Sequence, residues 1–454
     1  MQQARRTAGA GATALFGATA EEIAASVRAQ LDAGSLVPGD ALPPVRALAE
    51  QLGVNRNTAL AAYRLLVSAG IAVTRRGGGT ILLDPLAVLP EEGRAVKDAR
   101  DRGALLRDVG HGNPDPALLP DPLSVRLAPA PPRVYGEATS DPGLAEWATK
   151  WIARDQSRPF ALTVTSGAVD GVERLLAQAL APGDAVALED PCFLTSISTV
   201  KQAGYRPLAV TVDEAGMRPD ELRSALEAGA RAVVCTPRAH NPTGVSLTEE
   251  RAAELRAVLA DFPHVLIIED DHFALLSTAR YATIVPSTHR RWALVRSLSK
   301  VLGPDLRVAL VASDPLTAEQ LALRISGGIT WVSHLLQRVS LALLTAPGSD
   351  ERTARASAHY AERASSFVAQ LARVGLTGSG RDGLNVWVRT GAPAVDMLPR
   401  LRERGWLARG GHEFALGATF AAWVRLTVHA LDDAEQARLA DDLAWAAMGG
   451  VEFD

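Results

Sequence analysis

The hydrophobic pattern at the start of the chain predicts three helices. Apolar residues recur every four positions over residues 20–33, which indicates an amphipathic helix. A shorter helix is expected over residues 45–52, and a third begins after Asn55, a residue type that caps helix amino termini. A tight turn at Gly53 joins the second helix to the third. This arrangement is a helix-turn-helix.

Two short apolar runs follow the third helix. Residues 71–74 and 81–83 flank the basic, glycine-rich segment 75–80, a pattern typical of a β-hairpin with an exposed tip. A hairpin in this place forms a wing. The first domain is therefore expected to cover residues 1–83.

The rest of the chain has a different pattern. Residues 84–107 contain prolines and alternating charges without sustained apolar periodicity, so they are expected to be a linker. From residue 108 to residue 454, short apolar runs alternate with helix-length segments, which favours an α/β domain with a mostly parallel sheet. The predicted strands are 185–188, 232–235, 265–268, 294–295 and 308–312.

Composition agrees with a globular protein of more than one domain. The chain has 454 residues, of which 47% are hydrophobic and 22% charged. We find no apolar run of membrane-spanning length and no signal-peptide pattern, so a cytoplasmic protein is expected. Two cysteines, and nine histidines without ligand spacing, predict neither a disulfide framework nor a metal site.

Charge is distributed unevenly. Residues 1–83 contain eight arginines and no lysine against five acidic residues, which gives a net charge of +3. Because the whole chain has a net charge of −4, the remaining residues carry −7. Basic residues are nearly all arginine, and the chain has only four lysines. Lys300 is the one lysine that follows a buried-strand pattern, which makes it a candidate functional residue.

The stretch Ser297-Leu298-Ser299-Lys300, completed by Arg307, suggests cofactor chemistry. The lysine would emerge at the carboxyl end of a strand, where open α/β sheets bind their ligands. A lysine can form a Schiff base with an aldehyde, while hydroxyl groups and a guanidinium suit a phosphate. Together they point to pyridoxal phosphate. The alternative is a surface lysine after a strand, and the tetrad alone does not decide between the two.

Other candidates also lie at strand ends. Ser166, Gly167 and Ala168 lead into a predicted helix, whose amino terminus is a natural phosphate site. Phe193 is able to stack on a flat ring, and Asn241 to bond a phenolic oxygen. Individually, each of these signals is weak.

Two consecutive carboxylates follow a third strand. One of them, facing a pyridine nitrogen, would keep that nitrogen protonated and strengthen the ring as an electron sink. The alternative is a solvated cap at the strand end. The residues by themselves leave open whether Asp270 or Asp271 takes this place.

The exposed face of the third helix suits DNA. Arg56, Asn57 and Thr58 stand at its start, where a helix entering the major groove contacts phosphates and base edges, and Arg46 is placed to reach the backbone. A three-helix protein-binding module with solvated arginines is the alternative.

A family resemblance favours DNA binding. The stretches Leu36–Ala49, Val54–Thr58 and Gly79-Thr80 resemble the winged helix-turn-helix of the GntR family of bacterial repressors. The resemblance implies double-stranded operator DNA as a partner. It departs from the usual pattern at Pro44 and Asn55, where serine is commoner. The DNA-binding residues expected are Arg46, Arg56, Asn57, Thr58, Arg75, Arg76, Gly77 and Gly79.

The order of motifs over residues 109–446 resembles the fold type I aminotransferases. This implies a smaller carboxyl-terminal α+β subdomain, an internal aldimine on Lys300 and Asp270 on the pyridine nitrogen, these two being the catalytic residues. Arg425 would bind the carboxylate of a substrate or effector. The cofactor-binding residues implied are Ser166, Gly167, Ala168, Phe193, Asn241, Asp270, Ser297, Ser299, Lys300, Arg307 and, reaching the phosphate of a partner subunit, Tyr135. His272, which we add to this set, stands where a tyrosine is usual.

A GntR-type winged helix in front of an aminotransferase-like domain is the arrangement of the MocR family of pyridoxal-phosphate-dependent transcription regulators. The resemblance implies a homodimeric DNA-binding regulator that senses pyridoxal phosphate or an amino compound. Two alternatives remain at this point: a working aminotransferase with a DNA-binding appendage, and a cofactor-free effector or dimerisation module.

Overall fold

The computed structural model describes residues 15–68, 71–75, 79–82, 106–417 and 419–450. The chain divides into two compact units, a small amino-terminal unit and a larger one. The predicted linker lies outside the described residues except for its end. There, Arg107 already forms strand β3 (Arg107–Asp108) of the larger unit.

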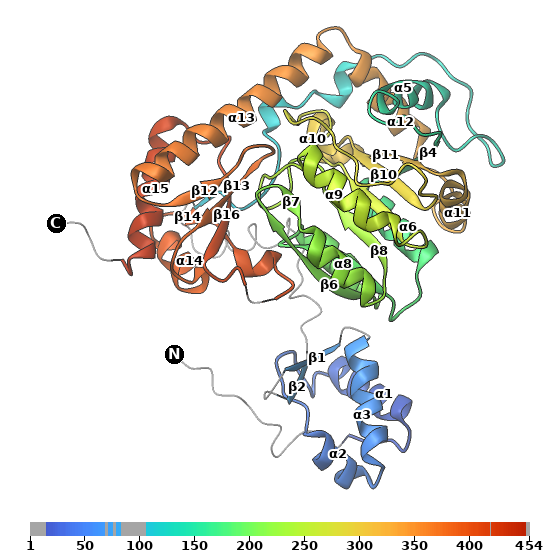
Figure 1. The fold of residues 1–454 in the computed structure, drawn as a ribbon, viewed down its shortest axis with the longest axis vertical. Helices are drawn as coiled ribbons and strands as arrows, with labels where there is room; N and C mark the ends of the chain where they lie inside the picture. Colours follow the sequence, from blue (N-terminus) through green and yellow to red (C-terminus); the bar gives the residue numbers. More distant parts are fainter. Residues whose placement is uncertain (1–14, 69–70, 76–78, 83–105, 418, 451–454) are drawn as a thin grey trace. The chain divides into compact units, whose positions relative to one another are not determined.

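The amino-terminal unit is a winged helix-turn-helix (Figure 1). Its first helix begins where Thr19 accepts the backbone N–H of Glu22 in a capping box, and its second ends at Gly53, which has a φ of 65° that suits glycine. The wing is an antiparallel hairpin, and its tip at residues 76–78 lies outside the described residues. The elements are α1 (Ala20–Asp32), α2 (Val45–Leu52), α3 (Arg56–Ser68), β1 (Ala72–Arg75) and β2 (Gly79–Leu82).

The larger unit contains an eight-stranded, mostly parallel sheet with the order β4-β11-β10-β9-β8-β5-β6-β7. The central strands β5, β10 and β11 are buried along their whole length, as a sheet covered by helices on both faces requires. The strands are β4 (Ala161–Thr165), β5 (Ala185–Asp190), β6 (Arg206–Asp213), β7 (Gly216–Met217), β8 (Ala230–Cys235), β9 (Leu266–Asp270), β10 (Trp292–Ser297) and β11 (Ala309–Ser313).

Helices pack against this sheet, and Figure 1 shows α8 and α9 lying along its strands. The α-helices are α5 (Pro142–Ile152), α6 (Ala168–Ala179), α7 (Leu194–Gln202), α8 (Pro219–Glu227), α9 (Glu249–Ala260), α10 (Ser299–Leu302), α11 (Pro315–Ser326), α12 (His334–Thr345) and α13 (Ser349–Arg373). Short 3-10 turns are η1 (Pro116–Leu118), η2 (Pro122–Ser124) and η3 (Pro304–Leu306).

The expected α+β subdomain follows helix α13. An antiparallel sheet of order β12-β13-β16-β15 packs against α14 and α15 around a core that includes Phe367, Trp406 and Leu426. The elements are β12 (Thr377–Ser379), β13 (Asn385–Arg389), α14 (Ala394–Glu403), β14 (Trp406–Leu407), β15 (Arg409–Gly410), η4 (Gly411–Phe414), β16 (Trp423–Thr427) and α15 (Asp433–Ala447). None of the helices in the described part of the chain is long and apolar enough to cross a membrane.

Candidate functional site

Lys300 lies in helix α10, directly after the buried strand β10. Its Nζ donates a hydrogen bond of 2.8 Å to the carbonyl oxygen of Gly112. The turn between strand and helix is held by Ser297, whose hydroxyl accepts the backbone N–H of Ser299 at 3.2 Å. The predicted lysine and both serines therefore lie together at the carboxyl end of the sheet.

The two candidate carboxylates have different partners. Asp271 is fully buried, and its oxygens accept from Arg238 at 3.0 and 2.6 Å and from Arg296 at 2.9 Å. By contrast, Oδ1 of Asp270 is buried and has no hydrogen-bond partner among the described residues. Burial, and after it the charge of Asp271, raises the pKa of Asp270 to about 7. Asp270 is thus the carboxylate that lacks a cation.

A second group surrounds the amino terminus of α6. Gly167 precedes this helix with a φ of 94°, and a Cβ added there would lie 2.7 Å from Nη2 of Arg307. That Nη2 donates to the carbonyl oxygen of Ser166 at 3.1 Å, so the exposed guanidinium of Arg307 lies over the start of the helix. The backbone N–H of Ser166 donates to a carboxylate oxygen of Asp170 at 2.9 Å. The first helical residue, Ala168, completes a cradle that suits a phosphate.

Asn241 and Arg425 form a third group. The side-chain oxygen of Asn241 accepts from Nη1 of Arg425 at 3.1 Å and from Asn385 at 3.3 Å, which leaves its Nδ2 as a donor. Arg425 is fully buried on strand β16, and burial lowers its pKa to about 9. Its guanidinium carbon lies 4.7 Å from the centre of the Phe414 ring.

His272 and Phe193 border these groups. Burial, followed by the positive charge of Lys300, lowers the pKa of His272 to about 4, so the imidazole is neutral at pH 7. Phe193 is half-buried and immediately precedes α7. The N–H of its neighbour Cys192 donates to the carbonyl oxygen of Phe414, which connects this turn to the Arg425 group.

Tyr135 lies apart from these groups. Its side chain is 85% exposed, and its ring centre is 5.3 Å from that of Trp331. An exposed tyrosine of this kind is compatible with the expectation that it serves a partner subunit.

The sequence analysis missed several residues that shape the site. Arg238 and Arg296 neutralise Asp271, Asn385 orients Asn241, and Gly112 accepts from Lys300. Only Arg296 had a visible signal, because it is the charged residue within an otherwise apolar strand, and apolar strands rarely bury an unpaired charge.

The candidate DNA face is on the amino-terminal unit. Arg46 and Arg56 are exposed and line one hollow of about 420 Å³ between α2 and α3. Asn57 is exposed, and its backbone N–H donates to the side-chain oxygen of Asn55. Thr58 is half-buried. Gly79 opens strand β2 with a φ of 78°. The side chain of Arg75, together with Arg76 and Gly77, lies outside what the structure describes.

Comparisons with known proteins agree with both units. Residues 19–82 match the bacterial regulatory proteins of the gntR family, and residues 132–443 match aminotransferase class I and II. The vitamin B6 salvage pathway transcriptional repressor PtsJ of Salmonella typhimurium is 44% identical over 94% of this chain and 98% of its own. The probable rhizopine catabolism regulatory protein MocR of Rhizobium meliloti is 26% identical over 76% of each chain.

Solved structures support the fold of the larger unit. The α-aminoadipate aminotransferase LysN of Thermus thermophilus, complexed with N-(5'-phosphopyridoxyl)-L-leucine, has a TM-score of 0.66 at 22% identity. The match covers 79% of this chain and 95% of LysN.

A GntR-type winged helix followed by a class I and II aminotransferase fold defines a class of proteins. In this class a DNA-binding domain is joined to an aminotransferase-like domain. This chain belongs to the MocR-type transcription regulators of the GntR family. Its cofactor is pyridoxal 5'-phosphate.

Proposed function

We propose that this regulator binds operator DNA as a homodimer and senses vitamin B6 by holding pyridoxal phosphate on Lys300. The observation that carries the proposal is the buried, unpartnered Oδ1 of Asp270 on strand β9. Asp270 is paired in register with Val295 on the parallel strand β10, whose end leads into Lys300. An amine and an uncompensated carboxylate at adjacent strand ends suit the aldehyde and the pyridine nitrogen of this cofactor.

The remaining residues supply the other contacts of the cofactor. We expect the phosphate to be held by Arg307 and the start of α6 at Ser166, Gly167 and Ala168, together with the hydroxyls of Ser297 and Ser299. When bound, pyridoxal phosphate supplies an aldehyde that binds amines and a ring that accepts electrons.

The ring would be held from its other sides by neutral groups. Nδ2 of Asn241 is the donor left for the ring oxygen, because its side-chain oxygen already accepts from Arg425. His272, neutral at pH 7, takes the place of the usual tyrosine as a second neutral partner. Phe193 provides the stacking surface.

With the cofactor bound, Asp270 would hold the pyridine nitrogen in its protonated form. In the cofactor-free site its pKa of about 7 reflects a charge buried without a cation. A protonated ring nitrogen supplies that cation and favours the ionised carboxylate. Binding therefore relieves an unfavourable burial, which contributes to the affinity of the site for this cofactor.

The bond from Lys300 to Gly112 offers a route from cofactor to DNA-binding unit. Gly112 belongs to the segment that runs directly from the linker through β3. With its Nζ bonded to the cofactor aldehyde, Lys300 would lose ammonium hydrogens of the kind that now donate to the carbonyl oxygen of Gly112. The start of the larger unit thus differs between the two states, and a ligand that prefers one state shifts the population.

Two further features complete the proposal. The exposed Tyr135 would contact the cofactor phosphate of the other subunit, which makes the site depend on a homodimer with two-fold symmetry and paired DNA half-sites. Because it would bind operator DNA, the protein would act in the cytoplasm. The effector is a B6 vitamer, in line with the name of the Salmonella relative.

The test is a visible absorption spectrum of the purified protein, compared with Lys300→Ala and with the matched control Lys201→Ala, an exposed lysine on α7. Binding to an operator fragment, chosen by repeated rounds of selection, is measured with and without pyridoxal phosphate. We expect a cofactor band in wild type and in the control, absent in Lys300→Ala, and a change in DNA affinity that follows the band. A wild type that shows no band after cofactor addition would refute the cofactor site.

A second function is favoured by Arg425, a buried guanidinium next to Asn241 of the kind that binds amino-acid carboxylates. This observation supports an active aminotransferase. Two results together would replace the regulator proposal with this one. The first is sustained turnover of an amino acid plus an oxo acid that is lost in Arg425→Leu, and the second is a DNA affinity that does not change when the cofactor is added.

A further inference from the structure

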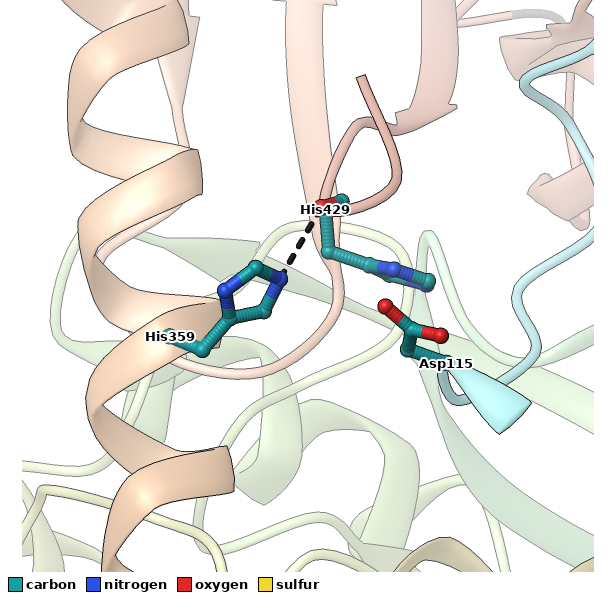
Figure 2. A group of neighbouring side chains, drawn as sticks. All are labelled: Asp115, His359 and His429. Atoms are coloured by element: carbon teal, nitrogen blue, oxygen red, sulfur yellow. Dashed lines mark hydrogen bonds between the residues drawn. The ribbon is translucent and has the colours of Figure 1, made fainter. Parts of the chain in front are cut away.

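Three residues that lie far apart in the sequence meet beside the segment that Lys300 contacts. Asp115 is the N-cap of η1, His359 lies on α13 and His429 follows strand β16 (Figure 2). One potential ligand atom from each lies within 4.8 Å of the other two. Since His359 and His429 are 70 positions apart, and Asp115 is further still, sequence spacing gave no sign of this group.

His429 presents a nitrogen lone pair without a partner. Its Nε2 lies 2.8 Å from the carbonyl oxygen of Asn113, and because a carbonyl only accepts, Nε2 carries the proton. Nδ1 is then the basic nitrogen, and it is buried without a hydrogen-bond partner among the described residues. The residue is 4% exposed, and burial lowers the pKa of the imidazole to about 4, which keeps it neutral.

The other two side chains are half-buried and adaptable. Nε2 of His359 contacts the carbonyl oxygen of His429 at 3.0 Å, and Figure 2 shows this edge of the ring turned toward the other two residues. Since that carbonyl only accepts, Nε2 of His359 carries the proton here, and metal binding would move this proton to Nδ1 and break the hydrogen bond. Asp115 uses Oδ1 to accept the N–H of Ala117 at 2.9 Å, so its second oxygen remains for a cation.

We propose that Asp115, His359 and His429 bind a divalent transition-metal ion such as Zn²⁺, with water as the fourth ligand. Two imidazoles and one carboxylate are a ligand set that such ions prefer. His429 also has the outer contact typical of metal-binding histidines, since its far N–H donates to the Asn113 carbonyl. Ligands of a tetrahedral Zn²⁺ lie about 3.4 Å apart, so the half-exposed Asp115 and His359 move inward by at most about 1.4 Å.

The ion would connect two parts of the larger unit. Asp115 follows Gly112 by three residues, whereas His359 and His429 belong to helix α13 and to the loop after β16. A bound metal would fix the segment that holds Gly112 and Asp115 to helix α13 and to the loop after β16. Because the ion binds the folded state, it raises the melting temperature of the protein.

The experiment is a Zn²⁺ titration by calorimetry on the full-length, cofactor-loaded protein. The variants are His359→Gln and Asp115→Asn, with the exposed His264→Gln as matched control. We expect one ion per chain in wild type and control, and affinity weaker by at least about ten-fold in either variant, the lower end of what losing even an outer partner costs a metal site. Melting curves without metal show whether each variant is folded.

The results separate this site from surface binding. A melting temperature that rises with Zn²⁺ in wild type and control but not in the two variants supports the site. Zn²⁺ affinity that is unchanged in folded His359→Gln or Asp115→Asn overturns it, as does binding that is lost in His264→Gln. Because cofactor absorption is read separately, failure here leaves the regulator proposal standing.

Discussion

Replacing Asp270 with asparagine is expected to stabilise the cofactor-free protein at neutral and alkaline pH. The pKa of the folded carboxyl is raised from 3.8 to about 7, first by burial and then by Asp271. The folded state therefore holds a proton that the unfolded chain has already released. Stability is highest when the carboxyl is protonated in both states, and it falls as pH rises from about 4 to about 7.

The magnitude follows from the two pKa values. Each pH unit between them costs about 1.4 kcal/mol, so from pH 5 to pH 7 the wild type loses up to about 2.7 kcal/mol of unfolding free energy. Asp270→Asn does not titrate and loses none of this. Above pH 7 the difference between the two proteins is constant.

Urea unfolding of the cofactor-free proteins at pH 5, 7 and 8, followed by tryptophan fluorescence, measures this difference. Asp305→Asn, which changes an exposed carboxyl in η3, is the matched control. Equal pH dependence of unfolding in wild type and Asp270→Asn would refute the reasoning, because it would mean that Asp270 is not buried without a cation.

The same variant is expected to bind the cofactor less well. A hydrogen bond to a charged group contributes about 1.5–3 kcal/mol, which corresponds to a loss of roughly 10- to 150-fold in affinity for pyridoxal phosphate. Cofactor titration followed by absorption measures it. Undiminished affinity in Asp270→Asn would exclude Asp270 as the partner of the pyridine nitrogen.

Three further variants test separate parts of the structure. Asp271→Ala leaves Arg238 and a second buried arginine without their shared carboxylate and is expected to destabilise the protein by about 3–5 kcal/mol in urea unfolding; a loss below 1 kcal/mol would contradict this. Arg56→Ala should weaken operator binding and lower the slope of log affinity against log salt by about 1, as gel-shift titrations at several salt concentrations would show; an unchanged slope would remove this arginine from the phosphate contacts. Gly167→Ala places a side chain at a φ of 94° and against Arg307, which costs about 1–3 kcal/mol of stability and weakens cofactor binding; binding equal to wild type would mean that the cradle is not the phosphate site.

Local chemistry made much of the fold predictable. The helix-turn-helix was located to within about two residues because Asn55 and Gly53 act through their own backbone neighbourhood. Apolar runs located the buried strands for a similar reason. Strands β6 and β7 lie at one edge of the sheet and were missed. Polar residues interrupt the apolar run of β6, and β7 has only two residues, too few to form a pattern.

The roles of neighbouring acids could not be read from the sequence. Glu269, Asp270 and Asp271 are consecutive and chemically alike. Glu269 accepts hydrogen bonds from Tyr281 and neighbouring groups, whereas Asp271 is neutralised by arginines 25 and 33 positions away. Only tertiary packing shows that Asp270 is left without a cation, so the preference for it over Asp271 rested on the family resemblance.

The hydrogen bond between Lys300 and Gly112 suggests how cofactor binding in the larger unit affects the DNA-binding unit. A lysine ammonium has three N–H donors, and it loses most of them when its nitrogen is bonded to an aldehyde. The acceptor it leaves is a backbone carbonyl in the first segment after the linker, five residues beyond Arg107. Lys300→Met, which keeps much of the side-chain length but can neither donate nor react, should therefore leave DNA binding fixed in one state whatever the cofactor concentration. If operator affinity of this variant still responds to pyridoxal phosphate, the signal does not pass through Gly112.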